Sequence, residues 1–129
     1  MKALTFGFLL LTLLLSACTS EHRPMLNRGI VQNATADKLT EVRVLHHPTG
    51  ATAGFSAILP GLDAELGFSP TEMRADQGEI SWIERGRGYR VKLGLPKLER
   101  ADDRPRTLVY RIEPGGRATV SLQAGGPLR

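Results

Sequence analysis

The sequence predicts an all-β protein, a small antiparallel β-sandwich in one domain. Apolar and polar residues alternate with a period of two through most of the chain after residue 27, as they do in strands with one buried face. Turn-forming Gly and Pro residues, 14 and 8 in a chain of 129, separate these stretches at short intervals. No stretch after residue 18 shows helical periodicity over the length of an ordinary helix, and the chain length allows a single small domain.

Eight strands account for the alternating stretches. Val42 and Val44 alternate with charged neighbours, and Ile80 and Trp82 alternate with polar ones. Residues 70–77 are expected to form one helical turn, and the last three strands are expected to form a meander. The predicted strands span residues 28–34, 39–47, 54–59, 62–68, 78–85, 88–95, 106–113 and 117–122.

Stacking two sheets, each with one apolar face, gives a sandwich. An immunoglobulin-like or a transthyretin-like topology is expected, with a small barrel as the alternative. Trp82 and the two tyrosines are in phase with the aliphatic positions of their strands, which favours core packing over a sugar-stacking surface. The predicted core consists of Val42, Val44, Leu62, Leu66, Phe68, Ile80, Trp82, Tyr89, Val91, Leu93, Leu108, Tyr110, Ile112, Val120 and Leu122.

Residues 1–17 have the layout of a secretory signal peptide. Lys2 supplies a positive start, and residues 4–15 are mostly apolar over a length too short to cross a bilayer. The segment ends in Leu15-Ser16-Ala17-Cys18, and here the chain resembles the bacterial lipoproteins, whose lipobox is a Leu, two small residues and a Cys. The resemblance implies that Cys18 carries acyl chains that anchor the protein in a membrane.

The residue that follows the lipobox bears on which membrane is used. In the lipoproteins, Asp at this place tends to retain the protein in the inner membrane, so Thr19 implies the periplasmic side of the outer membrane. We expect residues 18–27 to be the lipidated Cys and a tether, residues 28–123 to be the sandwich, and residues 124–129 to be a frayed end.

The sequence predicts no catalytic residue, metal ion or cofactor. His46 and His47 are neighbours in a strand and therefore point to opposite faces, which argues against a shared metal ion. Asp63 and Glu65 share one face of a strand, and a solvated face explains them better than paired-carboxylate catalysis does. Ser56 lacks the second glycine of a nucleophile elbow.

Basic residues gather in the second half of the chain. Residues 85–106 contain eight basic and three acidic residues, in a chain whose net charge is +4. If the last three strands are neighbours, several of these side chains share an outer face. That face is either an ordinary solvated surface or one that binds anionic lipid head groups or an acidic envelope protein, and export disfavours nucleic acid. Its expected members are Arg85, Arg90, Lys92, Arg111 and Arg117.

These observations predict a lipid-anchored protein of the cell envelope with a non-catalytic binding or assembly role at the membrane surface. The alternatives are a passive accessory lipoprotein without a ligand of its own and a small envelope hydrolase. A hydrolase would need a pocket with converging polar groups and a titratable residue of perturbed pKa.

Overall fold

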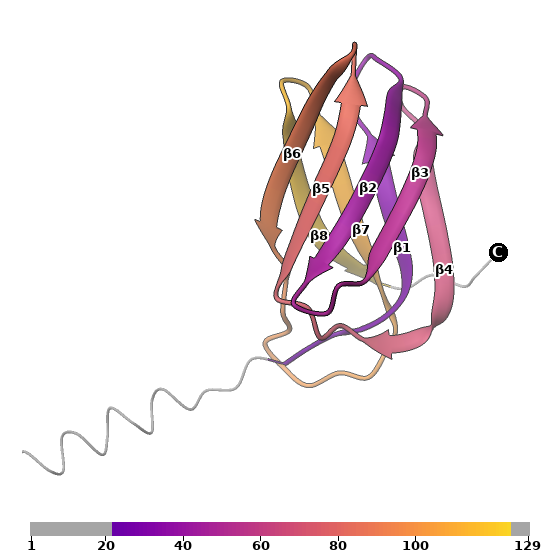
Figure 1. Cartoon of the computed structure of the whole chain (residues 1–129). Helices are drawn as coiled ribbons and strands as arrows, with labels where there is room; N and C mark the ends of the chain where they lie inside the picture. Colours follow the sequence, from indigo (N-terminus) through magenta and orange to yellow (C-terminus); the bar gives the residue numbers. More distant parts are fainter. Residues whose placement is uncertain (1–21, 125–129) are drawn as a thin grey trace, which may run out of the picture.

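The structure, a computed structural model, describes residues 22–124 and confirms the predicted small β-sandwich (Figure 1). The predicted signal peptide, Cys18, Thr19 and residues 125–129 lie outside the described part of the chain. The eight strands are β1 (Met25–Asn33), β2 (Leu39–His47), β3 (Thr52–Ile58), β4 (Asp63–Glu72), β5 (Gln77–Glu84), β6 (Arg87–Gly94), β7 (Arg106–Glu113) and β8 (Arg117–Ala124).

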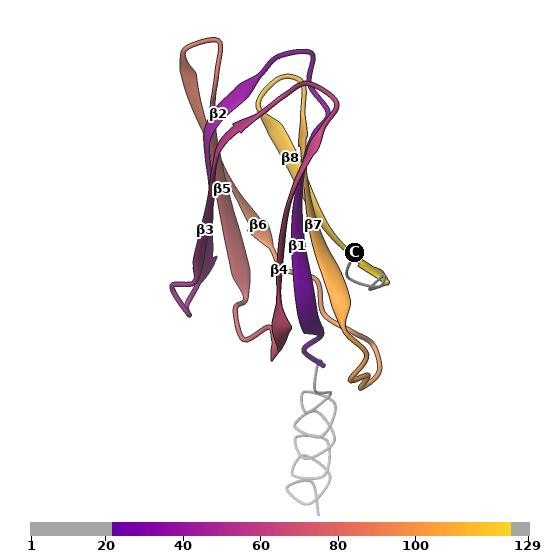
Figure 2. The same ribbon diagram turned by 90° about the vertical axis from the view of Figure 1, so that its right-hand side faces the viewer.

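The strands form two sheets of four, in the orders β4-β1-β7-β8 and β3-β2-β5-β6. Neighbouring strands are antiparallel, except that β1 runs parallel to β7 in the middle of the first sheet. The predicted meander of the last three strands is wrong, because β6 belongs to one sheet and β7 and β8 to the other. Figure 2 shows the two sheets edge-on as separate layers.

A hairpin forms where two strands of alternating apolar and polar residues are joined by residues that can adopt the backbone angles of a tight turn. The turn between β5 and β6 consists of Arg85 and Gly86, which both have positive φ, 52° and 75°. Positive φ at both central residues is the geometry of a two-residue type I′ turn, whose twist matches that of the flanking strands. The turn therefore lies one residue earlier than the predicted strands 78–85 and 88–95 imply.

The core lies between the two sheets and is built from the alternate apolar positions. Trp82 is only 1% exposed and stacks on Tyr89, with ring centroids 5.4 Å apart. Three of the predicted core residues are instead exposed: Leu62 by 55%, Leu66 by 46% and Phe68 by 36%. Buried apolar residues absent from the prediction are Leu26, Ile30, Val31, Leu39, Ile58, Met73, Ala75, Leu95 and Val109.

Two local predictions near the ends of strands are wrong. β1 begins at Met25, inside the expected tether, because Leu26 is buried in the core. The helical turn expected at residues 70–77 does not form, because β4 continues to Glu72 and pairs with β1 as far as Met25. The start of the described chain is also fixed by backbone hydrogen bonds between His22 and Leu98.

The sandwich is closed along one side and open along the other. On the closed side the edge strands β6 and β8 approach each other, and the Tyr89 ring lies so close to Gly116 that an added Cβ would meet it at 2.5 Å. On the other side β4 is exposed along almost its whole length, although Leu66 and Phe68 point inward. This open side, between β3 and β4, holds the apolar cleft described below.

Candidate functional site

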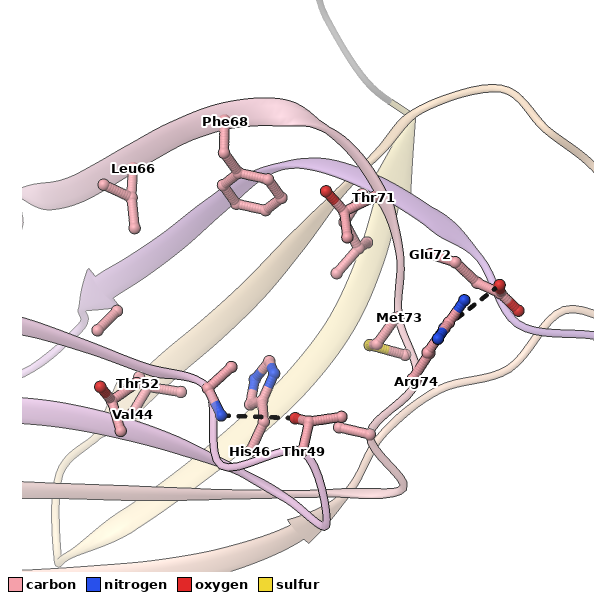
Figure 3. A pocket seen from close by; sticks show the side chains of 14 residues that line it. Val44, His46, Thr49, Thr52, Leu66, Phe68, Thr71, Glu72, Met73 and Arg74 are labelled. Carbon is pink, nitrogen blue, oxygen red and sulfur yellow. Dashed lines mark hydrogen bonds and ion pairs between the residues drawn. The ribbon is translucent and has the colours of Figure 1, made fainter.

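An apolar cleft of about 630 Å³ opens between the edge strands β3 and β4. Leu66 and Phe68 of β4 form one wall, and Val44 of β2 and Ala53 of β3 form the other (Figure 3). The walls are apolar because these positions face the interior of the sandwich, yet no strand covers them from outside. Clefts of this size with mostly apolar walls are typical of binding sites.

The cleft continues inward as a narrower space of about 90 Å³ that shares its walls. Phe55 of β3 and Val31 of β1 line this inner part. Its lining is almost wholly apolar, so a group that enters it exchanges water for hydrocarbon. Burial of apolar surface contributes about 25 cal/mol per Å², which is the driving force that such a site offers.

A polar pair lies at the floor of the cleft. His46 of β2 and Tyr110 of β7 come from opposite sheets, and the His46 Nε2 lies 2.8 Å from the Tyr110 hydroxyl oxygen. Gly78 of β5 is paired with His46 and makes room for the hydroxyl, because a Cβ at Gly78 would collide with it. The missing side chain at Gly78 therefore allows the two sheets to be joined by a hydrogen bond beneath the cleft.

Burial keeps this pair uncharged at neutral pH. Burial and, to a smaller extent, the neighbouring His47 lower the pKa of His46. Burial also raises the pKa of the Tyr110 hydroxyl well above its ordinary value. A neutral imidazole has one N–H donor and one acceptor nitrogen, so the pair presents hydrogen-bonding groups and no net charge to an occupant.

The mouth of the cleft is formed by the connection between β4 and β5 and carries paired charges. Arg74 lies 3.8 Å from Glu72 at the rim (Figure 3). Arg23 donates hydrogen bonds of 3.3 Å to the carbonyl oxygens of Met73 and Ala75, which line the mouth. The chain therefore enters the domain beside the mouth of the cleft, and the Arg23 guanidinium holds the rim of the cleft in place.

The polar groups of the cleft do not form a hydrolytic triad. Within residues 22–124, the hydrogen-bond partner of the His46 side chain is Tyr110, with no Ser or Thr hydroxyl and no carboxylate bonded to the ring. Nucleophilic catalysis would need a nucleophile and an orienting group on either side of the base. The cleft does contain two titratable residues with shifted pKa values, His46 and Tyr110, which is the feature that the sequence analysis required of a hydrolase.

The second histidine lies on the other face of the same strand, as the sequence predicts. The His47 Nε2 lies 3.3 Å from a carboxylate oxygen of Glu79, which also contacts Arg90 at 3.0 Å. Among residues 22–124 there is no group of three His, Cys, Asp or Glu side chains that could hold a metal ion.

The expected basic face does not form. Arg90 and Lys92 of β6 point out from one sheet, whereas Arg111 of β7 and Arg117 of β8 belong to the other sheet. Arg85 lies in the turn between β5 and β6 and pairs with Asp37 at 3.0 Å. The prediction failed because strands that follow one another in the chain are divided between opposite layers, so their outer residues point away from each other.

Sequence reasoning did not find the cleft. Alternation correctly placed Leu66 and Phe68 on the inward face of a strand, but it does not reveal whether the opposite sheet reaches far enough to cover that face. The one available signal was Pro70, which favours an edge strand for this segment.

The lowered pKa of His46 predicts a pH-dependent stability. Below its ordinary value of 6.5, the unfolded chain binds a proton that the folded chain does not, so stability falls as the pH decreases from 7.5 toward 5.5. His46→Gln should make the loss between these two pH values smaller, as measured by urea unfolding. An equal loss in the variant would show that other groups cause the effect.

The described residues contain no helix long and apolar enough to cross a membrane. Comparisons of the whole chain with known proteins found no matching family model, no matching curated protein and no matching solved structure.

Proposed function

We propose that this chain is a lipid-anchored protein of the cell envelope that binds an apolar group of a partner in the cleft between β3 and β4, without catalysing a reaction. The observation that carries the binding role is the cleft itself. It exposes Leu66 and Phe68 on an inward-facing strand surface, and it leads to a buried neutral pair, His46 and Tyr110. Exposed apolar surface of this kind costs solubility unless it serves an interaction.

The anchoring part of the proposal is supported by the lipobox-like sequence Leu15-Ser16-Ala17-Cys18. The first described residue, His22, follows Cys18 closely in sequence, and Arg23 contacts the rim of the cleft. An acylated Cys18 would thus hold the backbone of Arg23 within about 18 Å of the membrane surface, since an extended chain spans at most about 3.6 Å per residue.

Binding in the cleft can be tested with an environment-sensitive naphthalene-sulfonate dye. We expect its fluorescence to rise with the protein lacking residues 1–18, which retains all eight strands. Leu66→Asp places a charge in the wall and should lower the affinity at least about tenfold, since burying an unpaired charge costs more than 1.4 kcal/mol. Leu59→Asp is the matched control, because Leu59 is 53% exposed, close to the 46% of Leu66, but lies outside the cleft.

Equal dye binding by both variants would contradict a binding role for the cleft. Circular dichroism and the midpoint of thermal unfolding must show that each variant is folded before the affinities are compared.

The anchor is tested separately by Cys18→Ala. The variant should lose incorporation of a labelled fatty acid in growing cells, because a thiol is the group that accepts the lipid in the lipoproteins that the sequence resembles. Label that persists in Cys18→Ala, or is absent from the parent chain, would end the anchoring proposal while leaving the cleft untouched.

A further inference from the structure

Charges or a proline protect the edge strands β4 and β6, and β8 carries one charge, Arg117, whereas β3 has neither a charge nor a proline. Its sequence, Thr52–Ile58, contains no charged residue and no proline. The opposite edge of the same sheet, β6, carries Arg87, Arg90 and Lys92, and β4 carries three carboxylates and Pro70. Proteins place charges and prolines on edge strands to prevent pairing with other chains, so an unprotected edge is open to pairing.

The backbone of β3 offers hydrogen-bonding groups along this edge. The N–H of His46 donates to the carbonyl oxygen of Ala51 at 2.8 Å, which fixes the phase of the antiparallel ladder between β2 and β3. In such a ladder the residues alternate between those that bond to the neighbour and those that point away from it. The N–H and C=O groups of Thr52 and Gly54 therefore point toward the free edge.

The free edge and the apolar cleft are adjacent. Ala53 and Phe55 line the cleft from β3, and Leu66 and Phe68 line it from β4, where they are left uncovered. A strand added beside β3 would extend its sheet over the inner face of β4. Alternate side chains of that strand would then point into the cleft, because successive residues of a strand point to opposite faces.

We propose that the occupant of the cleft is an extended peptide segment of a partner protein, which pairs with β3 as an added strand and inserts apolar side chains at alternate positions between the sheets. The inference rests on the proposed function, since it identifies what the cleft binds. Main-chain hydrogen bonds supply affinity in this mode of recognition, and the pockets for alternate side chains supply specificity.

The combination of features favours a peptide over a lipid chain. An acyl chain would satisfy the apolar walls but would make no use of the backbone groups of Thr52 and Gly54, which would stay bonded to water. The charged side chains that line the cleft are Arg74 and Glu72, which are paired at the mouth, and Arg28 in the inner part.

In the test, peptides that bind the protein without residues 1–18 are selected from a display library of random ten-residue peptides. The enriched peptides should share apolar residues at every second position. Methylation of the peptide N–H groups that face β3 should weaken binding at least about tenfold, since losing one or two hydrogen bonds costs about 1.4 kcal/mol or more. This methylation leaves the peptide side chains unchanged, so a loss of affinity shows that the peptide backbone pairs with β3.

The protein side is tested by Thr52→Pro, which removes an N–H at the free edge while leaving the ladder to β2 intact. Thr52→Val is the matched control, because it alters the side chain and keeps the N–H. We expect the selected peptides to lose affinity for Thr52→Pro and to retain it for Thr52→Val. If Thr52→Pro does not fold, the methylated peptides alone decide the outcome.

Several results would overturn the inference. Enriched peptides without alternation, or peptides indifferent to methylation, would exclude strand addition. Displacement of the dye by dodecanoate but by no library peptide would identify a lipid chain as the occupant. Dimerisation of the protein that Thr52→Pro abolishes would identify a second copy. In each of these cases Leu66→Asp still weakens dye binding relative to Leu59→Asp, whereas failure of the proposed function would be seen as equal dye binding by these two variants.

Discussion

Trp82→Ala should lower the free energy of unfolding by about 3–5 kcal/mol, a large part of the about 5–15 kcal/mol that stabilises a small domain. Trp82 is the largest fully buried side chain, and it stacks on Tyr89 with an interplanar angle of 22°. The substitution removes both the buried area and the stacking partner, and the surrounding strands cannot move to fill the space. Urea unfolding followed by circular dichroism measures the loss.

Trp82→Phe provides the control for this prediction. A phenyl ring keeps an aromatic contact with Tyr89 but gives up the indole N–H, which lies 3.4 Å from a carboxylate oxygen of Glu84. We expect a loss well below that of Trp82→Ala. Unchanged stability in Trp82→Ala would contradict the packing described here.

Asn33→Ala should cost about 3 kcal/mol, although the residue is polar and lies at the end of a strand. The Asn33 amide nitrogen donates to the carbonyl oxygens of Asp37 and Ile58, at 2.8 and 3.0 Å. Its side-chain oxygen accepts hydrogen bonds from the N–H and the hydroxyl of Thr35, at 2.9 and 2.7 Å. Alanine would leave several buried groups without partners, and each such group costs about 1–3 kcal/mol.

Gln32→Ala is the matched control for Asn33→Ala, because Gln32 precedes it in β1 and points to the other face of the sheet. We expect a change within about 0.5 kcal/mol, as for most surface substitutions. If the two substitutions cost the same in urea unfolding, the hydrogen bonds of Asn33 do not stabilise the end of β1 in the way that its geometry indicates.

The existence of the eight strands was predictable because it depends on local alternation, although most of their limits differ by one to four residues from the predicted ones. The strands β2 (Leu39–His47) and β7 (Arg106–Glu113) have the predicted limits. Pairing between strands distant in sequence was not predictable in this way, since period-two alternation identifies a buried face without identifying what covers it. The same limit explains both the exposed Leu66 and Phe68 and the separation of the basic residues onto opposite sheets.

The candidate site depends still more on distant contacts. His46 and Tyr110 are 64 residues apart and lie in different sheets, and their contact requires the space beside Gly78. The sequence analysis correctly predicted that His46 and His47 point to opposite faces. It could not predict that the inward histidine meets a tyrosine, because that contact follows from how the two sheets are stacked.

The central place of β1 has a consequence for the order in which the chain folds. Of the described strands, β1 is synthesised first, yet it lies between β4 and β7, so its sheet remains incomplete until β7 is available. The sheet β3-β2-β5-β6 is instead assembled from strands that are close in sequence. Non-local pairing of the first kind gives a high contact order, which slows the folding of β-sandwiches to milliseconds or seconds. During synthesis, which proceeds from the N-terminus, the chain thus passes through a stage in which β1 and β4 are present and β7 is not. The domain gains its native stability only when nearly all of its strands have been synthesised.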